Sequence, residues 1–336
     1  PDALYDALIT GVRASLPSYH RYLDLRADRL GLNRLHAYDA YVPLVAAAPR
    51  EIPFAEARAW LCAACEPLGG AYLEWLERAF RERWIDVYEN RGKVSGAYSS
   101  ACYGSKPYVL LNYQGRLHDV FTLAHELGHA VHTALANEAQ PAHLAHYPIF
   151  LAEIASTCTE ELLLLYLLRR FAAEPGMSAL LLNQACDAYR GTVVRQTLFA
   201  DFEHQIHELD AQGVALTPAS LSRLYGGLNR HYQGPRFVAD AHSDAEWLRI
   251  PHFHYNFYVY KYATSFCAAQ IFAARLENDP AWRDAYLGLL RAGGAAEPLD
   301  LLRAAGVDLE QPLAFNEAAA RFVERLEALR RCFSDQ

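Results

Sequence analysis

The first residues whose types and spacing could do chemistry are His125 and His129, which enclose Glu126 in the sequence His-Glu-Leu-Gly-His. On a helix, residues four apart lie one turn above each other on one face, so both imidazoles can reach the same ion. Glu126 would then stand beside a water bound to that ion. Matches of this kind also arise by chance. The pattern therefore indicates a zinc site only where the surrounding sequence supplies the remaining parts.

A catalytic zinc ion typically takes three protein ligands and leaves one position for water. Glu153 follows His129 by 24 residues and is the best candidate for the third ligand, because its apolar neighbours would make an unpaired buried carboxylate costly. Glu160 lies two turns further on and is a candidate acceptor for the outer N–H of a zinc-bound histidine. Glu138 and Asp119 are weaker alternatives as ligands. A solvated helix face is the plain alternative for Glu153 and Glu160.

Hydrophobic periodicity predicts that helices position these residues. The histidine pair lies on a predicted helix at 116–136, and the two glutamates lie on one at 150–172. Residues 92–113 hold glycines, serines and aromatics with a β-rich run at 108–113, which predicts a hairpin or small sheet just before the motif helix. Further helices are predicted at 2–16, 18–31, 54–66, 70–89, 178–211, 218–232 (opened by Thr217 and Pro218), 254–277, 280–292, 297–305 and 312–333. The predicted fold class is mainly α with a small β element.

The composition narrows the class of protein and of partner. Hydrophobic residues make up 52% of the 336 residues, enough for a sizeable core. The net charge of −8 is spread along the chain without a basic run, so we expect no nucleic-acid partner. No apolar run approaches the ~18 residues that a membrane span needs, so we expect no membrane association. The seven cysteines are odd in number and scattered, which favours a reduced, cytoplasmic protein.

Two other pairs of residues have spacing that metals can use. Cys62 and Cys65 stand three apart, but no second pair follows them, so two packing thiols are favoured over a redox or metal site. His204 and His207 lie beside acidic residues, yet a solvated or internally satisfied helix face is favoured there as well.

The motif and its surroundings resemble the M3 family of zinc metallopeptidases, and in particular its oligoendopeptidase F branch. The resemblance rests on the five motif residues, on the Glu-x-Ala-Ser context of Glu153, and on the stretches 20–45, 95–113, 195–209 and 249–265. It covers nearly the whole chain. It implies a zincin-type helical fold with a small sheet beside the motif helix, and one zinc ion per chain bound by His125, His129 and Glu153. It also implies that Glu126 is the catalytic base, and Glu160 matches a family glutamate seven positions after the third ligand.

The resemblance further implies that the aromatic segment carries hydrogen-bond donors for the transition state. These donors map onto His252 and Tyr260, with Tyr258 as a further candidate. The residues agree with this role, because two histidines and four tyrosines within eleven residues are more polar donors than a core helix would want. A tyrosine-rich packing helix is the alternative. The chain departs from the branch at His254 and Ser265, and we expect His254 to affect substrate preference or to titrate near neutral pH.

Together these observations predict a single catalytic domain over residues 1–336, with a β element at about 92–113, a metal core at about 116–172 and a donor-rich segment at about 249–277. Family members carry an N-terminal helical lobe that forms one wall of a deep channel, and we expect this chain to lack it. The predicted function is a zinc-dependent endopeptidase that cleaves internal bonds of short oligopeptides. The absent lobe, or a second copy of the chain in a homo-oligomer, is a candidate further partner.

Three alternatives to that function stay open. The chain could be a catalytically weak or inactive zinc-containing module that binds peptides, because the missing lobe leaves its site open. It could be a zinc hydrolase that acts on a non-peptide amide. It could also be a structural helical protein with an accidental motif, which would bind no stoichiometric zinc.

Overall fold

The computed structural model describes residues 2–45 and 50–334. The chain forms two compact units by its internal contacts. Unit 1 comprises Pro1–Ala47, Pro175–Thr264 and Leu309–Gln336, and unit 2 comprises Ala48–Glu174 and Ser265–Asp308. The single catalytic domain expected from the sequence stays a prediction.

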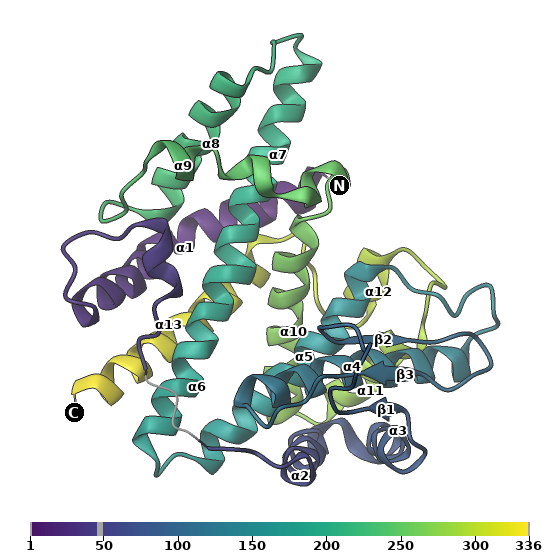
Figure 1. Ribbon diagram of the computed structural model, residues 1–336. Helices are drawn as coiled ribbons and strands as arrows, with labels where there is room; N and C mark the ends of the chain where they lie inside the picture. The colour runs from purple at the N-terminus through teal and green to yellow at the C-terminus, as the bar shows by residue number, and fades with distance from the viewer. Residues whose placement is uncertain (1, 46–49, 335–336) are drawn as a thin grey trace. The chain divides into compact units, whose positions relative to one another are not determined.

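Unit 2 is built around two helices that lie side by side, α4 (Leu117–Ala139) and α5 (Ile149–Arg170), as Figure 1 shows. The apolar residues of α4 point inward, and Leu123, Leu127 and Val131 are fully buried. The other helices of this unit are α2 (Phe54–Ala64), η2 (Glu66–Leu68), α3 (Gly69–Arg81), α11 (Ala281–Arg291), α12 (Pro298–Ala304) and most of α10 (Tyr260–Asn278). The predicted motif helix and the helix after it are confirmed.

The pair of helices approaches closely at Gly128, in the middle of the motif. A Cβ atom added to Gly128 would lie 2.7 Å from the Cα of Ser156 and 2.9 Å from the carbonyl oxygen of Ala155. These are backbone atoms, so they could give way only if one helix moved. The glycine therefore lets the face of α4 that carries the histidines sit directly against α5.

A three-stranded sheet precedes α4 in the chain. Its strands are β1 (Ile85–Asp86), β2 (Tyr98–Ser100) and β3 (Tyr108–Leu110), in the order β1-β3-β2. β3 pairs with β1 in parallel and with β2 antiparallel, with Ser99 opposite Val109. The predicted hairpin is confirmed. The helix predicted at 70–89 is wrong beyond Arg81, because Arg83 adopts a positive φ of 59° and the chain turns into β1.

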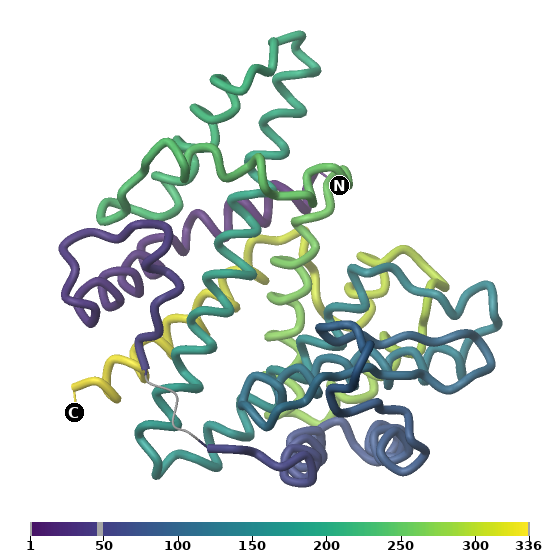
Figure 2. The backbone as a smooth tube through the Cα atoms, viewed as in Figure 1, coloured from purple at the N-terminus to yellow at the C-terminus, as the bar shows by residue number. Residues whose placement is uncertain are grey.

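Unit 1 consists mainly of helices. They are α1 (Asp2–Arg29), η1 (Ala37–Tyr41), α6 (Pro175–Ala188), the π-helical turn η3 (Tyr189–Val194), α7 (Arg195–Ala211), α8 (Pro218–Gln233), α9 (Ala241–Asp244), η4 (Glu246–Arg249), η5 (Pro251–His254) and α13 (Pro312–Ser334). Figure 2 shows α6, η3 and α7 as one continuous rod, as the sequence predicted apart from the π-helical turn. The Thr217 hydroxyl caps α8 by accepting from the Ser220 N–H. In the described part of the chain, no helix is both long and apolar enough to cross a lipid bilayer.

Two predicted helix boundaries in unit 1 are wrong. Residues 2–16 and 18–31 were expected as two helices, but α1 continues through Pro17. A proline inside a helix costs ~3 kcal/mol, and burial of Leu16, Tyr19 and Tyr22 on one continuous face offsets that cost. The aromatic helix expected at 254–277 begins only at Tyr260.

Candidate metal centre

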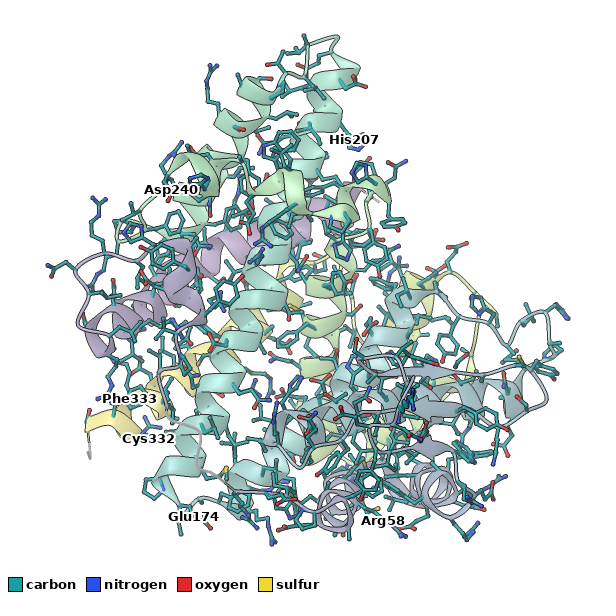
Figure 3. All side chains as sticks on the ribbon, in the orientation of Figure 1. Arg58, Glu174, His207, Asp240, Cys332 and Phe333 are labelled. Carbon is teal, nitrogen blue, oxygen red and sulfur yellow. The ribbon has the colours of Figure 1, made fainter. Side chains whose placement is uncertain are left out.

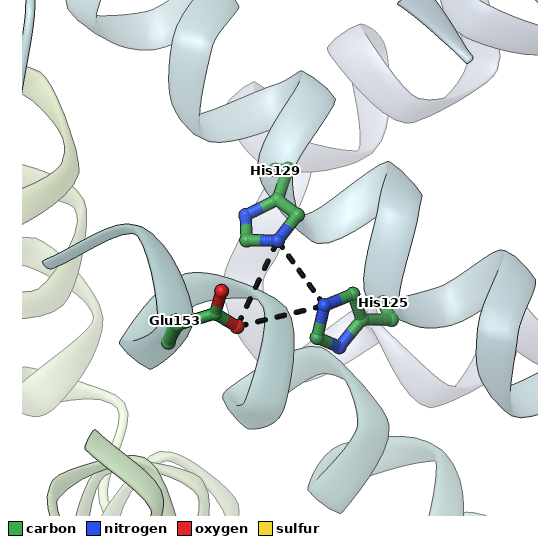
Figure 4. A group of neighbouring side chains, drawn as sticks. All are labelled: His125, His129 and Glu153. Atoms are coloured by element: carbon green, nitrogen blue, oxygen red, sulfur yellow. Dashed lines mark hydrogen bonds and ion pairs between the residues drawn. The ribbon is translucent and has the colours of Figure 1, made fainter. Parts of the chain in front are cut away.

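Two histidines and one glutamate of unit 2 point their ligand atoms at a common point (Figure 4). The Nε2 atoms of His125 and His129 lie 3.1 Å apart, one helical turn from each other on α4. From α5, the Oε2 atom of Glu153 lies 3.5 Å from the first Nε2 and 3.8 Å from the second. We call these three residues the metal group.

The donor set of the metal group fits a zinc ion. All three ligand atoms lie within 4.8 Å of one another, and two imidazole nitrogens with one carboxylate oxygen form a set that catalytic zinc sites use. All three side chains are partly buried, so each keeps some contact with solvent. Among the described residues, no other group of three His, Cys, Asp or Glu side chains meets this criterion.

Hydrogen bonds to other parts of unit 2 also hold the two histidine rings in place. The Nδ1 of His125 is hydrogen-bonded to the carboxylate of Glu160, and His129 makes a hydrogen bond to the backbone of Ala152. Such contacts fix the orientation and the tautomer of a ligating imidazole. Glu160 therefore lies where the sequence placed an acceptor, on the same helix as Glu153.

The pKa values of the two imidazoles are shifted in opposite directions. Burial lowers the pKa of His125, but the hydrogen bond and negative charge of Glu160, with Glu153 and Glu126, outweigh it and raise that pKa to about 9. Burial and the neighbouring charge of His125 lower the pKa of His129 to about 3. The two Nε2 atoms, 3.1 Å apart, are the atoms for which protons and a divalent cation would compete.

Glu126 lies beside the metal group and is only 7% exposed. Its pKa is raised above the usual value, first by burial and then by the carboxylates of Glu153 and Glu160, while His125 acts in the opposite direction. Its side chain accepts a hydrogen bond from the backbone N–H of Ser99. A carboxylate with raised proton affinity beside a metal group can accept and return a proton.

Ser99 is a contact of the candidate site that the sequence did not indicate. β3 lies between β1 and β2, so both of its edges are paired within the sheet. β2 is an outer strand, and its Ser99 N–H faces Glu126. The polar run 98–100 was visible in the sequence. Its position at the edge of the sheet was not, because strand order depends on pairing between segments that are far apart in the chain.

The three predicted donors belong to unit 1 and do not form one cluster. The ring of His252 stacks on that of Tyr258, with centroids 5.6 Å apart, and the Tyr258 hydroxyl lies 3.5 Å from the Tyr262 hydroxyl. Tyr260 instead packs against Tyr5 of α1, with ring centroids 5.2 Å apart, and burial raises its pKa. Their role as donors stays a prediction.

A left-handed turn separates η5 from α10. Asn256 and Phe257 have positive φ angles of 24° and 51°, a region that costs free energy for residues with a Cβ atom. The Phe257 N–H donates to the Oε1 of Glu203 at 2.7 Å. Glu203 is a buried carboxylate on α7, so this contact holds the turn that precedes Tyr258.

The weaker ligand candidates lie elsewhere. Asp119 caps α4 by accepting from the Arg116 N–H, and Glu138 is exposed at the end of that helix. His207 is exposed near the end of α7 (Figure 3), where its ring contacts Phe257. All seven cysteines are free thiols; Cys65 is buried, as expected for a packing residue.

The departure at Ser265 has a structural role in unit 2. This residue is 1% exposed, and its hydroxyl donates to the carbonyl oxygen of Phe150 at 2.9 Å. Phe150 lies in the first turn of α5, so Ser265 ties α10 to the start of the helix that carries Glu153.

Comparison with known proteins identifies chains of similar sequence and fold. The chain is 42% identical to oligopeptidase PepF of Bacillus subtilis (strain 168), over 98% of this chain and 49% of that protein. It is 43% identical to the chromosomal oligoendopeptidase F of Lactococcus lactis subsp. cremoris, over 98% of this chain and 54% of that protein. The crystal structure of oligoendopeptidase-F from Enterococcus faecium superposes with a TM-score of 0.79 at 35% identity, over 100% of this chain and 54% of that one.

The chain spans about half the length of the curated relatives it matches. The sequence profile described as Peptidase family M3 matches residues 1–321, which is nearly the whole chain. The chain therefore belongs to peptidase family M3.

Proposed function

We propose that this chain carries the catalytic site of a zinc-dependent endopeptidase that cleaves internal bonds of short oligopeptides. The observation that carries the proposal is the metal group of His125, His129 and Glu153 with the buried Glu126 beside it. The relatives named as oligopeptidases and oligoendopeptidases support peptides as the substrate class. One zinc ion per chain fits the one donor set found in the part of the chain that the structure describes.

When bound, zinc would supply Lewis acidity to the scissile carbonyl and lower the pKa of the attacking water toward ~7. Glu126 takes the proton that this water loses and returns it to the leaving nitrogen. Burial supports this cycle, because it keeps the pKa of Glu126 raised and so makes the carboxylate a ready proton acceptor. Glu160 and the backbone of Ala152 hold the two imidazoles in place throughout.

The outer edge of β2 is the proposed docking site for the peptide backbone. An extended peptide can add to an exposed strand edge through backbone hydrogen bonds, which leaves side-chain specificity to neighbouring pockets. The Ser99 N–H on this edge reaches Glu126, so a peptide laid along β2 has its backbone close to the proton acceptor. The role of His252, Tyr258 and Tyr260 as donors to the developing oxyanion rests on the family resemblance alone; such a donor contributes ~2.7–4 kcal/mol in comparable sites.

The experiment that tests the proposal compares the wild type with Glu126→Gln in zinc content and in cleavage of a quenched fluorescent peptide. We expect both proteins to hold one zinc ion per chain and only the wild type to cleave. Glu138→Gln, an exposed change on the same helix, is the matched control and should behave as the wild type. Undiminished cleavage by Glu126→Gln would overturn the assignment.

The same assay separates the alternatives. Bound zinc and bound peptide without cleavage by the wild type would favour an inactive peptide-binding module, which nothing in the comparisons supports. Cleavage of an acylamide but of no peptide would favour a non-peptide hydrolase.

The free thiol state of all seven cysteines supports the proposed cytoplasmic location.

A further inference from the structure

A cavity of about 390 Å³ lies within unit 1. Its walls come from the end of α1 and the loop after it, from η3 and the start of α7, and from α8, α9 and η4. Four arginines line it, namely Arg26, Arg190, Arg195 and Arg249. We call it the arginine cavity. Its lining includes no residue of the metal group and none of the predicted oxyanion donors.

The π-helical turn η3 brings two of these arginines to one side of their helix. The Arg195 N–H donates to the carbonyl oxygen of Arg190, which is the hydrogen bond between residues five apart that defines a π-helix. In a regular α-helix, residues five apart would point about 140° away from each other around the axis. The wider turn reduces this angle, and both side chains line the cavity. Such turns are rare and frequently lie at functional sites.

Arg195 and Arg249 share one carboxylate. The Oε1 of Glu246 lies 2.6 Å from a guanidinium nitrogen of Arg195, and the same oxygen pairs with Arg249. The Tyr41 hydroxyl accepts a further hydrogen bond from Arg195. This hydrogen bond is the largest cause of a lowered pKa at Tyr41, and the charge of Arg249 adds to it, while burial acts in the opposite direction. A phenol whose pKa is lowered in this way lies in a positive field, so one carboxylate does not neutralise the pair.

Arg26 and Arg190 share a second carboxylate. The Oδ1 of Asp187 lies 3.2 Å from Arg190 and 3.5 Å from Arg26. Arg26 is 1% exposed, and it donates to backbone carbonyl oxygens of the segment 39–42. Its Nε makes no hydrogen bond. A buried guanidinium group with an unpaired N–H is costly, so the protein compensates the charge of Arg26 only in part.

Two further aspartates lie near the cavity and bind backbone N–H groups. Asp39 accepts from the His36 N–H, and Asp240, labelled in Figure 3, accepts from the Ser243 N–H, both at 2.7 Å. These contacts cap η1 and α9. The ion pairs of the arginine cavity therefore set four guanidinium groups against two carboxylates.

Backbone hydrogen bonds fix two walls of the cavity. Leu35 and Phe237 form a parallel bridge between the loop after α1 and the loop after α8. In it, the Leu35 N–H donates to the carbonyl oxygen of Arg236 at 2.9 Å, and the Val238 N–H donates to that of Leu35 at 2.8 Å. The cavity is thus formed before any ligand arrives, as small-molecule sites usually are.

The charge and the lining of the cavity indicate which ligand it suits. Guanidinium groups match the oxygen atoms of carboxylates and phosphates. Two guanidinium charges in excess of the paired carboxylates favour a dianion, and a phosphate monoester carries a charge of about −1.5 to −2 at pH 7. The rings of Tyr38 and Tyr41 also line the cavity and are exposed, so they offer apolar faces to an organic group on the phosphate.

We propose that the arginine cavity binds a small organic phosphate monoester. The phosphate lies among Arg190, Arg195 and Arg249, and the organic group lies against Tyr38 and Tyr41. This site belongs to unit 1, and the proposal does not depend on the peptidase function proposed for the metal group.

The first test measures binding by isothermal titration calorimetry in the wild type, Arg190→Gln and Arg249→Gln. The probes are adenosine monophosphate, inorganic phosphate and adenosine. Arg249 is exposed, so its replacement tests the site even if Arg190→Gln folds poorly. The matched control is Arg223→Gln, which removes one positive charge from an exposed position on α8 outside the cavity.

We expect adenosine monophosphate to bind the wild type and Arg223→Gln equally, and to bind each cavity variant ~10-fold or more weakly, because a charge-assisted hydrogen bond is lost. Adenosine, which has no phosphate, should not bind. Failure of both phosphates to bind the wild type at millimolar concentration would overturn the proposal, and so would equal binding of adenosine monophosphate by all four proteins. No readout uses peptide cleavage, so this failure is distinguishable from failure of the proposed function.

The second test concerns the organic group. Tyr38→Ser should weaken the binding of adenosine monophosphate and leave that of inorganic phosphate unchanged. Tyr88→Ser, a change at an exposed tyrosine of unit 2, is the matched control and should bind both as the wild type does. Equal affinity of the wild type for the two phosphates, or unchanged binding of adenosine monophosphate by Tyr38→Ser, would contradict an organic phosphate as the ligand.

Discussion

Gly128 lies so close to Ser156 that a Cβ atom on the glycine would come within 2.7 Å of the Ser156 Cα. This contact joins the helix of the two histidines to the helix of Glu153 and Glu160, so the geometry of the metal group depends on a residue that is not itself a ligand.

Gly128→Ala should therefore force α4 and α5 apart. We expect a loss of about 1–3 kcal/mol in the free energy of unfolding, as for other overpacked cores, and weaker zinc binding. Both are measured directly, by denaturant titration and by competition with a chelator. Gly288→Ala on α11 is the matched control, because a Cβ atom there meets nothing within 4 Å. Equal stability and zinc affinity of the Gly128 and Gly288 variants would contradict this account.

Glu160 accepts from the outer nitrogen of His125, and its removal should weaken zinc binding without removing a ligand. We expect Glu160→Ala to lower zinc affinity ~10–100-fold, as for other partners of ligating histidines. Glu160→Gln keeps an acceptor oxygen and should recover part of the loss. Chelator competition measures the zinc affinity of both variants and of the surface control Glu138→Ala, which should bind zinc as the wild type does. Wild-type affinity in Glu160→Ala would show that this contact does not orient His125.

The raised pKa of Glu203 leads us to expect that the stability of unit 1 depends on pH. Burial raises its pKa, while the Phe257 N–H acts in the opposite direction. A carboxyl group whose folded pKa is raised stabilises the fold below its unfolded pKa and loses that contribution as pH rises through the folded value. Glu203→Gln stays neutral and keeps the acceptor for Phe257. It should therefore be more stable than the wild type at pH 7, with the difference shrinking toward pH 4.

Denaturant titration of both proteins across that pH range measures the effect. Asp210→Asn, an exposed change near the end of the same helix, should follow the wild type at every pH. A Glu203→Gln variant that is less stable than the wild type at pH 7 would mean that the ionised carboxylate stabilises the turn at Asn256 and Phe257.

Local patterns predicted the parts of the site that depend on helical repeats. The spacing of His125 and His129, and the two-turn separation of Glu153 and Glu160, follow from helix geometry alone. The α4 and α5 boundaries accordingly agree with the prediction to within a few residues. That these side chains bind zinc stays a prediction.

Features set by contacts between distant segments were not predictable in the same way. β1 has two residues and exists only because β3 pairs with it, and the same pairing makes β2 the outer strand beside Glu126. The conformational preference of Pro17 predicts the end of a helix, but packing of the buried face of α1 stabilises a helix that continues past it. The left-handed turn at Asn256 and Phe257 contains no glycine, so the sequence does not predict it.

The central claim is that His125, His129 and Glu153 together hold one zinc ion, and the bound metal can be counted. We would measure zinc per chain after exhaustive dialysis for the wild type, Glu153→Ala and the surface control Glu138→Ala. One zinc ion per chain in the wild type and the control, with loss from Glu153→Ala, is the predicted result. A wild type that retains no zinc, or a Glu153→Ala variant that retains a full equivalent, would contradict the account.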